Sequence, residues 1–182
     1  LIKNNKIKHK YYLSDISNNA LKKAKKNISY KNAYFRVGKF FNPWKDNAYK
    51  FDILISDISS INDTVAKLSP WYKGVVCNSG QDGLKNIKII LDQVTFFMNK
   101  KSYFIIPVIS LCAHKKLDKI LKKKFFIKYT EKKHWPLPVF FEKNLNLMKK
   151  LRNKSYIDFK KKFNINTAFT SIAICKLKTK KN

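Results

Sequence analysis

The chain has 182 residues, and its 40 Lys and Arg against 11 Asp and Glu give a formal net charge of +29 at pH 7. Hydrophobic residues make up 45% of the chain and aromatic residues 14%, enough for a packed core, which excludes an intrinsically disordered protein. No apolar run reaches the roughly 18 residues that cross a bilayer, which excludes a membrane-spanning helix. We expect one soluble, cytoplasmic domain over residues 1–182.

Short apolar runs and amphipathic stretches alternate along the sequence. Apolar runs predict strands, and apolar residues three or four positions apart predict helices. In chain order we expect a strand over 10–14, a helix over 18–27, strands over 34–37 and 51–56, one or two helical turns over 62–68, a helix over 83–99, a strand over 102–108, a helix over 113–123, a strand over 125–131, a helix over 142–154 and a strand over 170–177.

This order predicts an α/β fold with a doubly wound, mostly parallel sheet. The strand over 51–56 looks apolar on both faces, as in a parallel strand covered by helices on each side. The last two strands should form an antiparallel pair, and the segment 132–169 between them is expected to be an insertion. Within it, 134–138 (HWPLP) favours a rigid turn or part of a substrate lid.

Three acidic positions follow predicted strands or precede a predicted helix. Asp15 could accept hydrogen bonds from the two hydroxyls of a ribose, or it could be a turn or capping residue. The block 56–59 (SDIS) could hold a substrate group beside a cofactor, or form an ordinary Asx or Ser turn. Asp82 is expected to cap the helix over 83–99 and to favour its positive end.

Cysteine and histidine positions do not suggest a metal site. The cysteines are too far apart for a CxxC knuckle or a dense disulfide framework, which fits a reducing compartment: they are Cys77, Cys112 and Cys175. The three histidines form no HExxH pattern and no closely spaced pair. We therefore expect no bound metal.

Four segments, taken together and in order, resemble a known family. They are 12–27 (YLSDISNNALKKAKKN), 38–44 (GKFFNPW), 51–57 (FDILISD) and 79–84 (SGQDGL). They look like the consecutive motifs of class I S-adenosylmethionine-dependent methyltransferases, and the closest layout is that of the release-factor glutamine methyltransferases. The resemblance covers roughly residues 10–108 and implies a Rossmann-like fold with S-adenosylmethionine as methyl donor.

The resemblance also implies roles for individual residues. Asp15 would bind the ribose hydroxyls of S-adenosylmethionine, and Ile16 would border its adenine. Lys39 and Phe40 would lie near the adenine edge. Within the SDIS block, Ser56 would contact the cofactor, whereas Asp57 and Ser59 would orient the methyl acceptor.

Two departures from the family are visible. The family's glycine-rich loop would precede Leu1, so the chain is expected to be an amino-terminally truncated methyltransferase. SDIS stands in place of the family's Asn-Pro-Pro-Tyr, whose Asn side chain and proline carbonyl hold a planar nitrogen. Asp57 can accept a hydrogen bond from an N–H, but Ser56 cannot replace an amide.

Three functions follow as hypotheses. The first is methyl transfer to a nitrogen or oxygen of a protein, RNA or small molecule. The second is a non-catalytic basic module that binds RNA or ribosomes, although only Arg36 and Arg152 are Arg and no RNA-binding motif is present. The third is an enzyme acting on nucleic acid, in which Trp71 and Tyr72 stack on a base or simply pack. Lys, Ile and Asn all have AT-rich codons, so a composition bias of the genome could also explain much of the excess of Lys and hence the positive charge.

Overall fold

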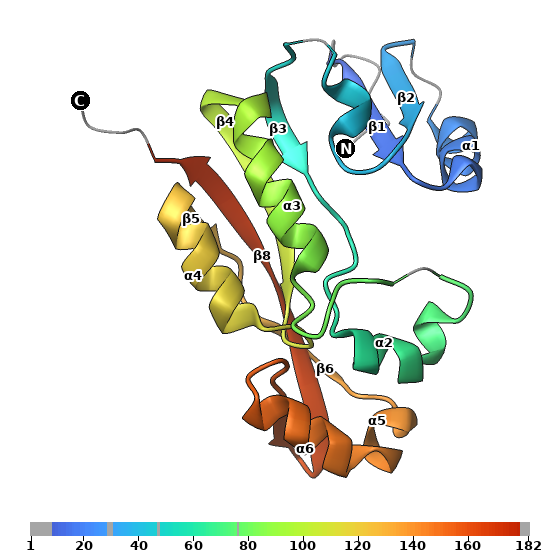
Figure 1. Ribbon diagram of the computed structural model, residues 1–182, viewed down its shortest axis with the longest axis vertical. Coiled ribbons are helices and arrows are strands. Elements are labelled where there is room, and N and C mark those ends of the chain that lie inside the picture. Colours follow the sequence, from blue (N-terminus) through green and yellow to red (C-terminus); the bar gives the residue numbers. More distant parts are fainter. Residues whose placement is uncertain (1–8, 29–30, 47, 76, 179–182) are drawn as a thin grey trace. The chain divides into compact units, whose positions relative to one another are not determined.

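The computed structural model describes residues 9–28, 31–46, 48–75 and 77–178 (Figure 1). The chain divides into two compact units, residues 1–49, here the N-terminal unit, and residues 50–182, here the C-terminal unit. The prediction of one domain over the whole chain stays a prediction. Within the described ranges, no helix is long and apolar enough to cross a membrane.

The N-terminal unit is a parallel strand pair with one helix. Strand β1 (Tyr11–Asp15) pairs with β2 (Ala33–Val37), and helix α1 (Asn18–Asn27) connects them. The predicted cap is confirmed, because the Ser17 side chain accepts a hydrogen bond from the Ala20 N–H. Tyr12 packs against Tyr34 at 5.0 Å and against Trp44 at 5.3 Å between ring centroids, and Trp44 is buried.

The C-terminal unit is built on a six-stranded mixed sheet. The order of the four central strands is β3 (Phe51–Ile55), β4 (Met98–Ile109), β8 (Ile165–Leu177) and β5 (Phe125–Tyr129). Strands β3 and β4 are parallel, whereas β8 runs antiparallel to β4 and β5. Two short strands, β6 (Lys133–Pro136) and β7 (Lys160–Lys162), also pair with β8. The predicted α/β fold with a final antiparallel pair is confirmed.

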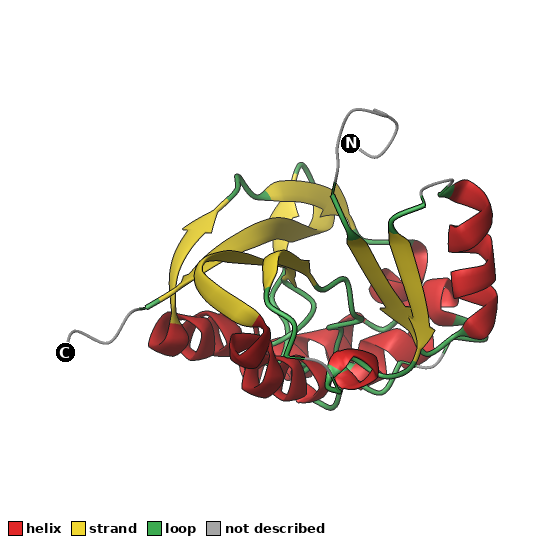
Figure 2. Cartoon of the chain, turned by 90° about the horizontal axis from the view of Figure 1, so that it is seen from above, coloured by secondary structure: helices red, strands yellow, loops and turns green. Residues whose placement is uncertain are grey.

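Helices of the C-terminal unit gather on one side of its sheet (Figure 2). They are α2 (Asp63–Leu68), α3 (Lys85–Gln93), α4 (His114–Lys124), α5 (Val139–Lys143) and α6 (Leu145–Asn153). Short 3-10 helices cover Pro70–Tyr72 (η2) and Val94–Phe97 (η3). Apolar residues spaced three or four apart in the predicted helix over 83–99 are buried: Leu84, Ile87, Ile90, Leu91, Val94 and Met98. The α-helix itself ends at Gln93 and continues as η3, so it is shorter than expected.

Strand β3 departs from the expectation that both of its faces are covered. Leu54 is 4% exposed on the helix-covered face, whereas Ile53 and Ile55 on the other face are 60% and 71% exposed. Alternation along a strand places them on opposite sides of the sheet. The apolar run therefore marks one buried face and one open apolar face.

The segment between β5 and β8 contains more regular structure than its sequence predicts. The stretch over 134–138 is largely strand β6, not a turn, and β8 starts at Ile165. The expected helix over 142–154 is two helices separated at Asn144, whose side chain donates a hydrogen bond to the Phe140 carbonyl at 2.8 Å. Phe141, Met148 and Phe159 belong to a second apolar cluster that also includes Val65 of α2. That 132–169 is an insertion stays a prediction.

Candidate functional site

The carboxyl end of β1 carries Asp15, the predicted ribose-binding residue. Oδ1 of Asp15 accepts a hydrogen bond from the Ser17 N–H at 2.7 Å, the geometry of an Asx turn. The carboxylate is exposed, and no described residue donates a hydrogen bond to its Oδ2. Asp15 thus shapes the start of α1 and keeps one oxygen available to a ligand. Ile16, the next residue, is 62% exposed.

Lys39 and Phe40 lie at the same edge of this strand pair, because β1 and β2 are parallel and end together. The Ser14 hydroxyl donates a hydrogen bond to the Phe40 carbonyl at 3.1 Å, which joins the turn after β2 to the end of β1. Gly38 makes the turn possible, since a Cβ there would overlap the Pro43 ring. The structure therefore brings together the four predicted residues of the N-terminal unit, Asp15, Ile16, Lys39 and Phe40.

The SDIS block follows β3 in the C-terminal unit. Ser56 is 6% exposed, and its N–H donates a hydrogen bond to the Ile105 carbonyl at 3.0 Å. Its hydroxyl is buried, and no described group accepts from it or donates to it. A buried hydroxyl without a partner costs free energy unless a ligand satisfies it. Asp57 is exposed, so this strand end has both an unsatisfied hydroxyl and an available carboxylate.

Two further residues belong to this site: Cys77, which the sequence did not suggest as a site residue, and Tyr72, which it suggested only for stacking on a base. The Ser59 hydroxyl lies 2.8 Å from Sγ of Cys77. Burial raises the pKa of Tyr72, a hydrogen bond with Ser59 lowers it, and the charges of Cys77 and Asp57 raise it further, with a net increase. Asp57, Ser59, Tyr72 and Cys77 therefore form one cluster.

A cavity of about 550 Å³ lies beside this cluster. Tyr72 and Cys77 line it together with α2, η2 and Phe140. Trp71 does not line the cavity; its ring packs against Trp135 and Phe140 at 5.6 and 6.0 Å between ring centroids, and it is 50% exposed. The cavity falls within the size range of small-molecule sites, roughly 300–1,000 Å³.

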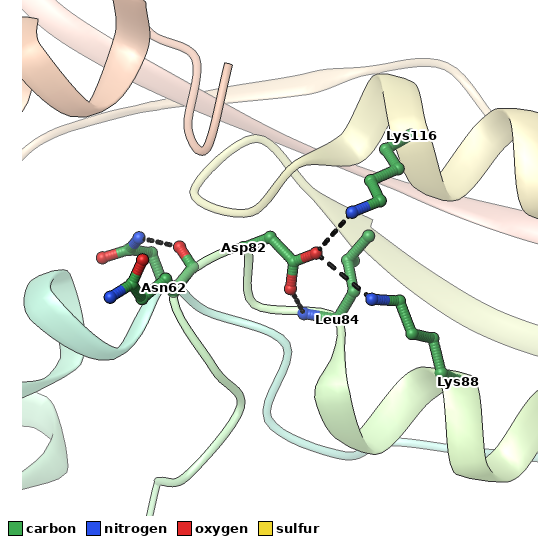
Figure 3. A network of polar contacts seen from close by, with 6 residues as sticks. Asn62, Asp82, Leu84, Lys88 and Lys116 are labelled. Carbon is green, nitrogen blue, oxygen red and sulfur yellow. Dashed lines mark hydrogen bonds and ion pairs between the residues drawn. The ribbon is translucent and has the colours of Figure 1, made fainter. Parts of the chain in front are cut away.

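Asp82 belongs to a structural network instead of capping the long helix (Figure 3). Helix α3 has Leu84 at its N-cap and no side-chain cap, so the predicted capping by Asp82 is wrong, whereas its contacts with Leu84, Lys88 and Lys116 fit the expected structural role. Oδ1 of Asp82 accepts from the Leu84 N–H at 3.0 Å, and Oδ2 contacts Lys88 at 3.3 Å and Lys116 at 2.9 Å. Burial opposes ionisation of Asp82, but the bonds from Lys116 and the Leu84 N–H and the charge of Lys88 outweigh it and lower its pKa.

Asn62 completes the same network. Its Oδ1 caps α2 by accepting from the Thr64 and Val65 N–H groups at 2.9 and 3.1 Å, and its Nδ2 donates to the Gln81 carbonyl. Gly83 packs tightly here, since a Cβ would lie 2.7 Å from Cβ of Cys112. These contacts fix the loop beside the SDIS block. Over the described ranges, no three His, Cys, Asp or Glu side chains form a group that could hold a metal ion.

Comparison with known proteins identifies the family. A family model described as "Methyltransferase domain" matches residues 2–165. No curated protein matches significantly. Among solved structures, a TehB-like SAM-dependent methyltransferase from Corynebacterium glutamicum is similar at 10% identity and a TM-score of 0.46, covering 93% of this chain and 69% of that one. A precorrin 8W decarboxylase from Methanobacterium thermoautotrophicum is similar at 10% identity and a TM-score of 0.42, covering 93% of this chain and 70% of that one. Because the family model spans most of the chain, the chain belongs to the methyltransferase domain family, which confirms the predicted enzyme class and its Rossmann-like α/β fold.

Proposed function

We propose that this domain transfers a methyl group from S-adenosylmethionine to a nitrogen or oxygen acceptor. The observation that carries the proposal is the position of Asp15 within the methyltransferase match, at the end of a parallel strand with one carboxylate oxygen available. S-adenosylmethionine, when bound, supplies a methyl group that is electrophilic because it is attached to a positively charged sulfur. Such reactions depend mainly on the positioning of donor and acceptor.

The N-terminal unit would hold the nucleoside part of the donor. Asp15 would accept hydrogen bonds from ribose hydroxyls through Oδ2, because Oδ1 already accepts from Ser17. The exposed side chain of Ile16 would contact the adenine ring. Lys39 and Phe40 follow β2 at the same edge, and the Lys39 ammonium lies 5.2 Å from the Phe40 ring centroid.

The C-terminal unit would orient the acceptor. The partnerless Ser56 hydroxyl is suited to a polar group of donor or acceptor. Asp57 would accept a hydrogen bond from the acceptor N–H or O–H and take up or pass on its proton as the acceptor's new bond to the methyl carbon replaces that carbon's bond to sulfur. Ser59 and Tyr72 would fix the acceptor's orientation from the side of the cavity. The finer likeness to release-factor glutamine methyltransferases supports a planar nitrogen, although SDIS lacks the amide that group uses.

A second candidate function is binding of RNA or ribosomes through lysine-rich helices. It is favoured by the exposed lysines of α1, which are Lys22, Lys23, Lys25 and Lys26. A surface of this kind binds polyanions at low salt whatever its sequence. Binding that disappears at moderate salt and ignores the RNA sequence would therefore reflect charge alone.

The test is a transfer assay with methyl-labelled S-adenosylmethionine and separated cellular fractions of protein, RNA and small molecules. We expect label in one fraction, and a decrease of the rate by about 100-fold in Asp57→Asn, since loss of a positioned proton acceptor typically costs that much. The matched control is Asp52→Asn, which changes an exposed carboxylate on β3. Absence of label in every fraction, or equal loss in both variants, would contradict the proposal.

A further inference from the structure

A small basic pocket in the C-terminal unit is separate from the residues discussed so far. It has a volume of about 260 Å³ and includes His114 and Lys115 at the start of α4, Lys132 just before β6, His134 in β6, and Lys160 of β7. These cations and imidazoles come from three elements far apart in the sequence. The volume is below the roughly 300 Å³ of a typical small-molecule site, so it suits a compact group.

The floor of the pocket is the ring of Phe169 on β8. The Lys132 ammonium lies 4.4 Å from its centroid, and the rings of His114 and His134 lie at 5.1 and 6.0 Å. Phe169 is 7% exposed, and its backbone is hydrogen-bonded to Ser110 in both directions. The floor is therefore fixed, and its ring is too covered to stack on a base.

The charge of this pocket is not balanced within the described residues. None of its three lysines forms an ion pair there. The single carboxylate of the lining, Asp158, already lies 3.5 Å from Nε of Arg152. Bringing lysines together costs free energy through mutual repulsion, which a bound anion would remove.

The pKa values of both histidines of the pocket are lowered, with burial as the first cause and nearby lysines as a further one. Burial lowers the pKa of His114, and the charge of Lys132 lowers it further against the opposing effect of Asp158. Slight desolvation and the charges of Lys162, Lys160 and Lys132 lower the pKa of His134. Lysine is abundant throughout this chain, but histidine is not, and two of its three histidines meet at one ring. Compositional bias does not explain that convergence.

From the convergence of three lysines and two histidines around one fixed cavity, we infer that this pocket binds a phosphate group. A phosphate offers several strong acceptor oxygens and a negative charge, which match ammonium and imidazole N–H donors. The N-terminus of α4, an 11-residue helix that begins at His114, adds positive potential at the pocket. His114 and Lys115 of the pocket come after β4, as the SDIS block comes after β3. Because β3 and β4 are parallel, both groups lie at the same edge of the sheet. The inference does not rest on methyl transfer.

The first experiment titrates inorganic phosphate into the full chain at constant ionic strength and follows the histidine ring resonances by NMR. We expect saturable shifts of His114 and His134, while His9 in the N-terminal unit stays unchanged as an internal control. Shifts of all three, or a linear response without saturation, would show charge screening only and would overturn the inference.

Matched variants separate the pocket from net charge. Lys132→Gln with Lys160→Gln should raise the Kd for phosphate by about tenfold or more, because a hydrogen bond to a charged group contributes on the order of a tenfold factor. Lys100→Gln with Lys101→Gln removes the same charge from exposed positions of β4 and should leave the Kd unchanged. Equal weakening by both pairs would overturn the inference.

A competition experiment identifies the source of the phosphate group. A short single-stranded oligoribonucleotide that displaces inorganic phosphate from both histidines, without preference for base sequence, would assign the pocket to a nucleic-acid backbone. Displacement by ribose 5-phosphate but not by the oligoribonucleotide would assign it to a small phosphomonoester. Either result supports a phosphate pocket, and failure of both competitors would count against it.

Discussion

The hydroxyl oxygen of Ser59 lies 2.8 Å from Sγ of Cys77, which joins the segment after β3 to the segment before α3. The two residues are 18 positions apart in the sequence. Their contact, with Tyr72 and Asp57 close by, places a polar cluster beside the 550 Å³ cavity. It gives the proposed acceptor site three kinds of functional group: a carboxylate, hydroxyls and a thiol.

Cys77 should be the cysteine that reacts first in the folded protein. Burial is the main cause that raises the pKa of Cys112 and of Cys175 to about 12, so their thiols stay protonated at pH 8, whereas Cys77 is only partly buried. A thiol-reactive chromophore at pH 8 should modify one thiol rapidly and the other two only on unfolding. Cys77→Ser should abolish the rapid phase, and its persistence would contradict the assignment.

Ser56→Ala should leave folding stability unchanged or increase it, because it removes a buried hydroxyl without a partner. The same change should slow methyl transfer, because Ser56 is one of the polar groups proposed for this strand end. The matched control is Ser79→Ala, which removes a hydroxyl that donates to the Ser59 carbonyl at 2.8 Å and should cost about 1 kcal/mol. Chemical denaturation measures the free energy of unfolding of both variants. A destabilised Ser56→Ala variant would show that the Ser56 hydroxyl has a hydrogen-bond partner within the protein.

Asp82→Asn should lower the free energy of unfolding by about 1 kcal/mol at pH 7, since the two lysine partners are partly exposed. Folding lowers the pKa of Asp82 below its ordinary value of 3.8. The ionised carboxylate therefore stabilises the fold fully above the pKa of the unfolded chain, and this stabilisation is lost as the pH falls through the pKa of the folded protein. The difference from wild type should therefore shrink below pH 3.8. Asp92→Asn, at a side chain 78% exposed, should have little effect at any pH.

Gly83→Ala should destabilise the protein more than Gly74→Ala. Both glycines have positive φ, 71° and 76°, so both variants share the cost of that backbone conformation. Only at Gly83 would a Cβ also meet Cβ of Cys112, at 2.7 Å, whereas nothing lies within 4 Å at Gly74. We expect an additional loss of about 1–3 kcal/mol by thermal or chemical denaturation. Equal losses would contradict the tight packing described for this loop.

Elements with a strong local pattern were predictable from the sequence. Helix α1 has the expected bounds because Leu21 lies on a narrow apolar face and Ser17 supplies the cap. Strand β7 was not predictable, since its three residues are all exposed lysines and it depends on pairing with β8. Its hairpin turn also places Phe163 and Asn164 at positive φ, which Phe seldom adopts.

In the candidate site too, some residues could be predicted from local sequence and others depend on tertiary contacts. Asp15 and the SDIS block follow strands, so their places at strand ends could be predicted from local sequence. Tyr72 and Cys77 reach the site through tertiary contacts that no short motif encodes. Asp82 precedes a helix and has the residue type of a cap, but two lysines and the turn at Leu84 determine where its carboxylate lies.

The most direct test of the central claim is calorimetric titration of the chain with S-adenosylmethionine, in wild type, Asp15→Ala and Asp46→Ala. Asp46 is an exposed carboxylate of the same unit and serves as the matched control. The account predicts saturable binding that Asp15→Ala weakens by about tenfold or more, from the loss of charge-assisted hydrogen bonds to the ribose, while Asp46→Ala binds as wild type does. Unchanged affinity in Asp15→Ala would contradict the proposed donor site, and absence of binding to wild type would contradict the proposed function of this chain.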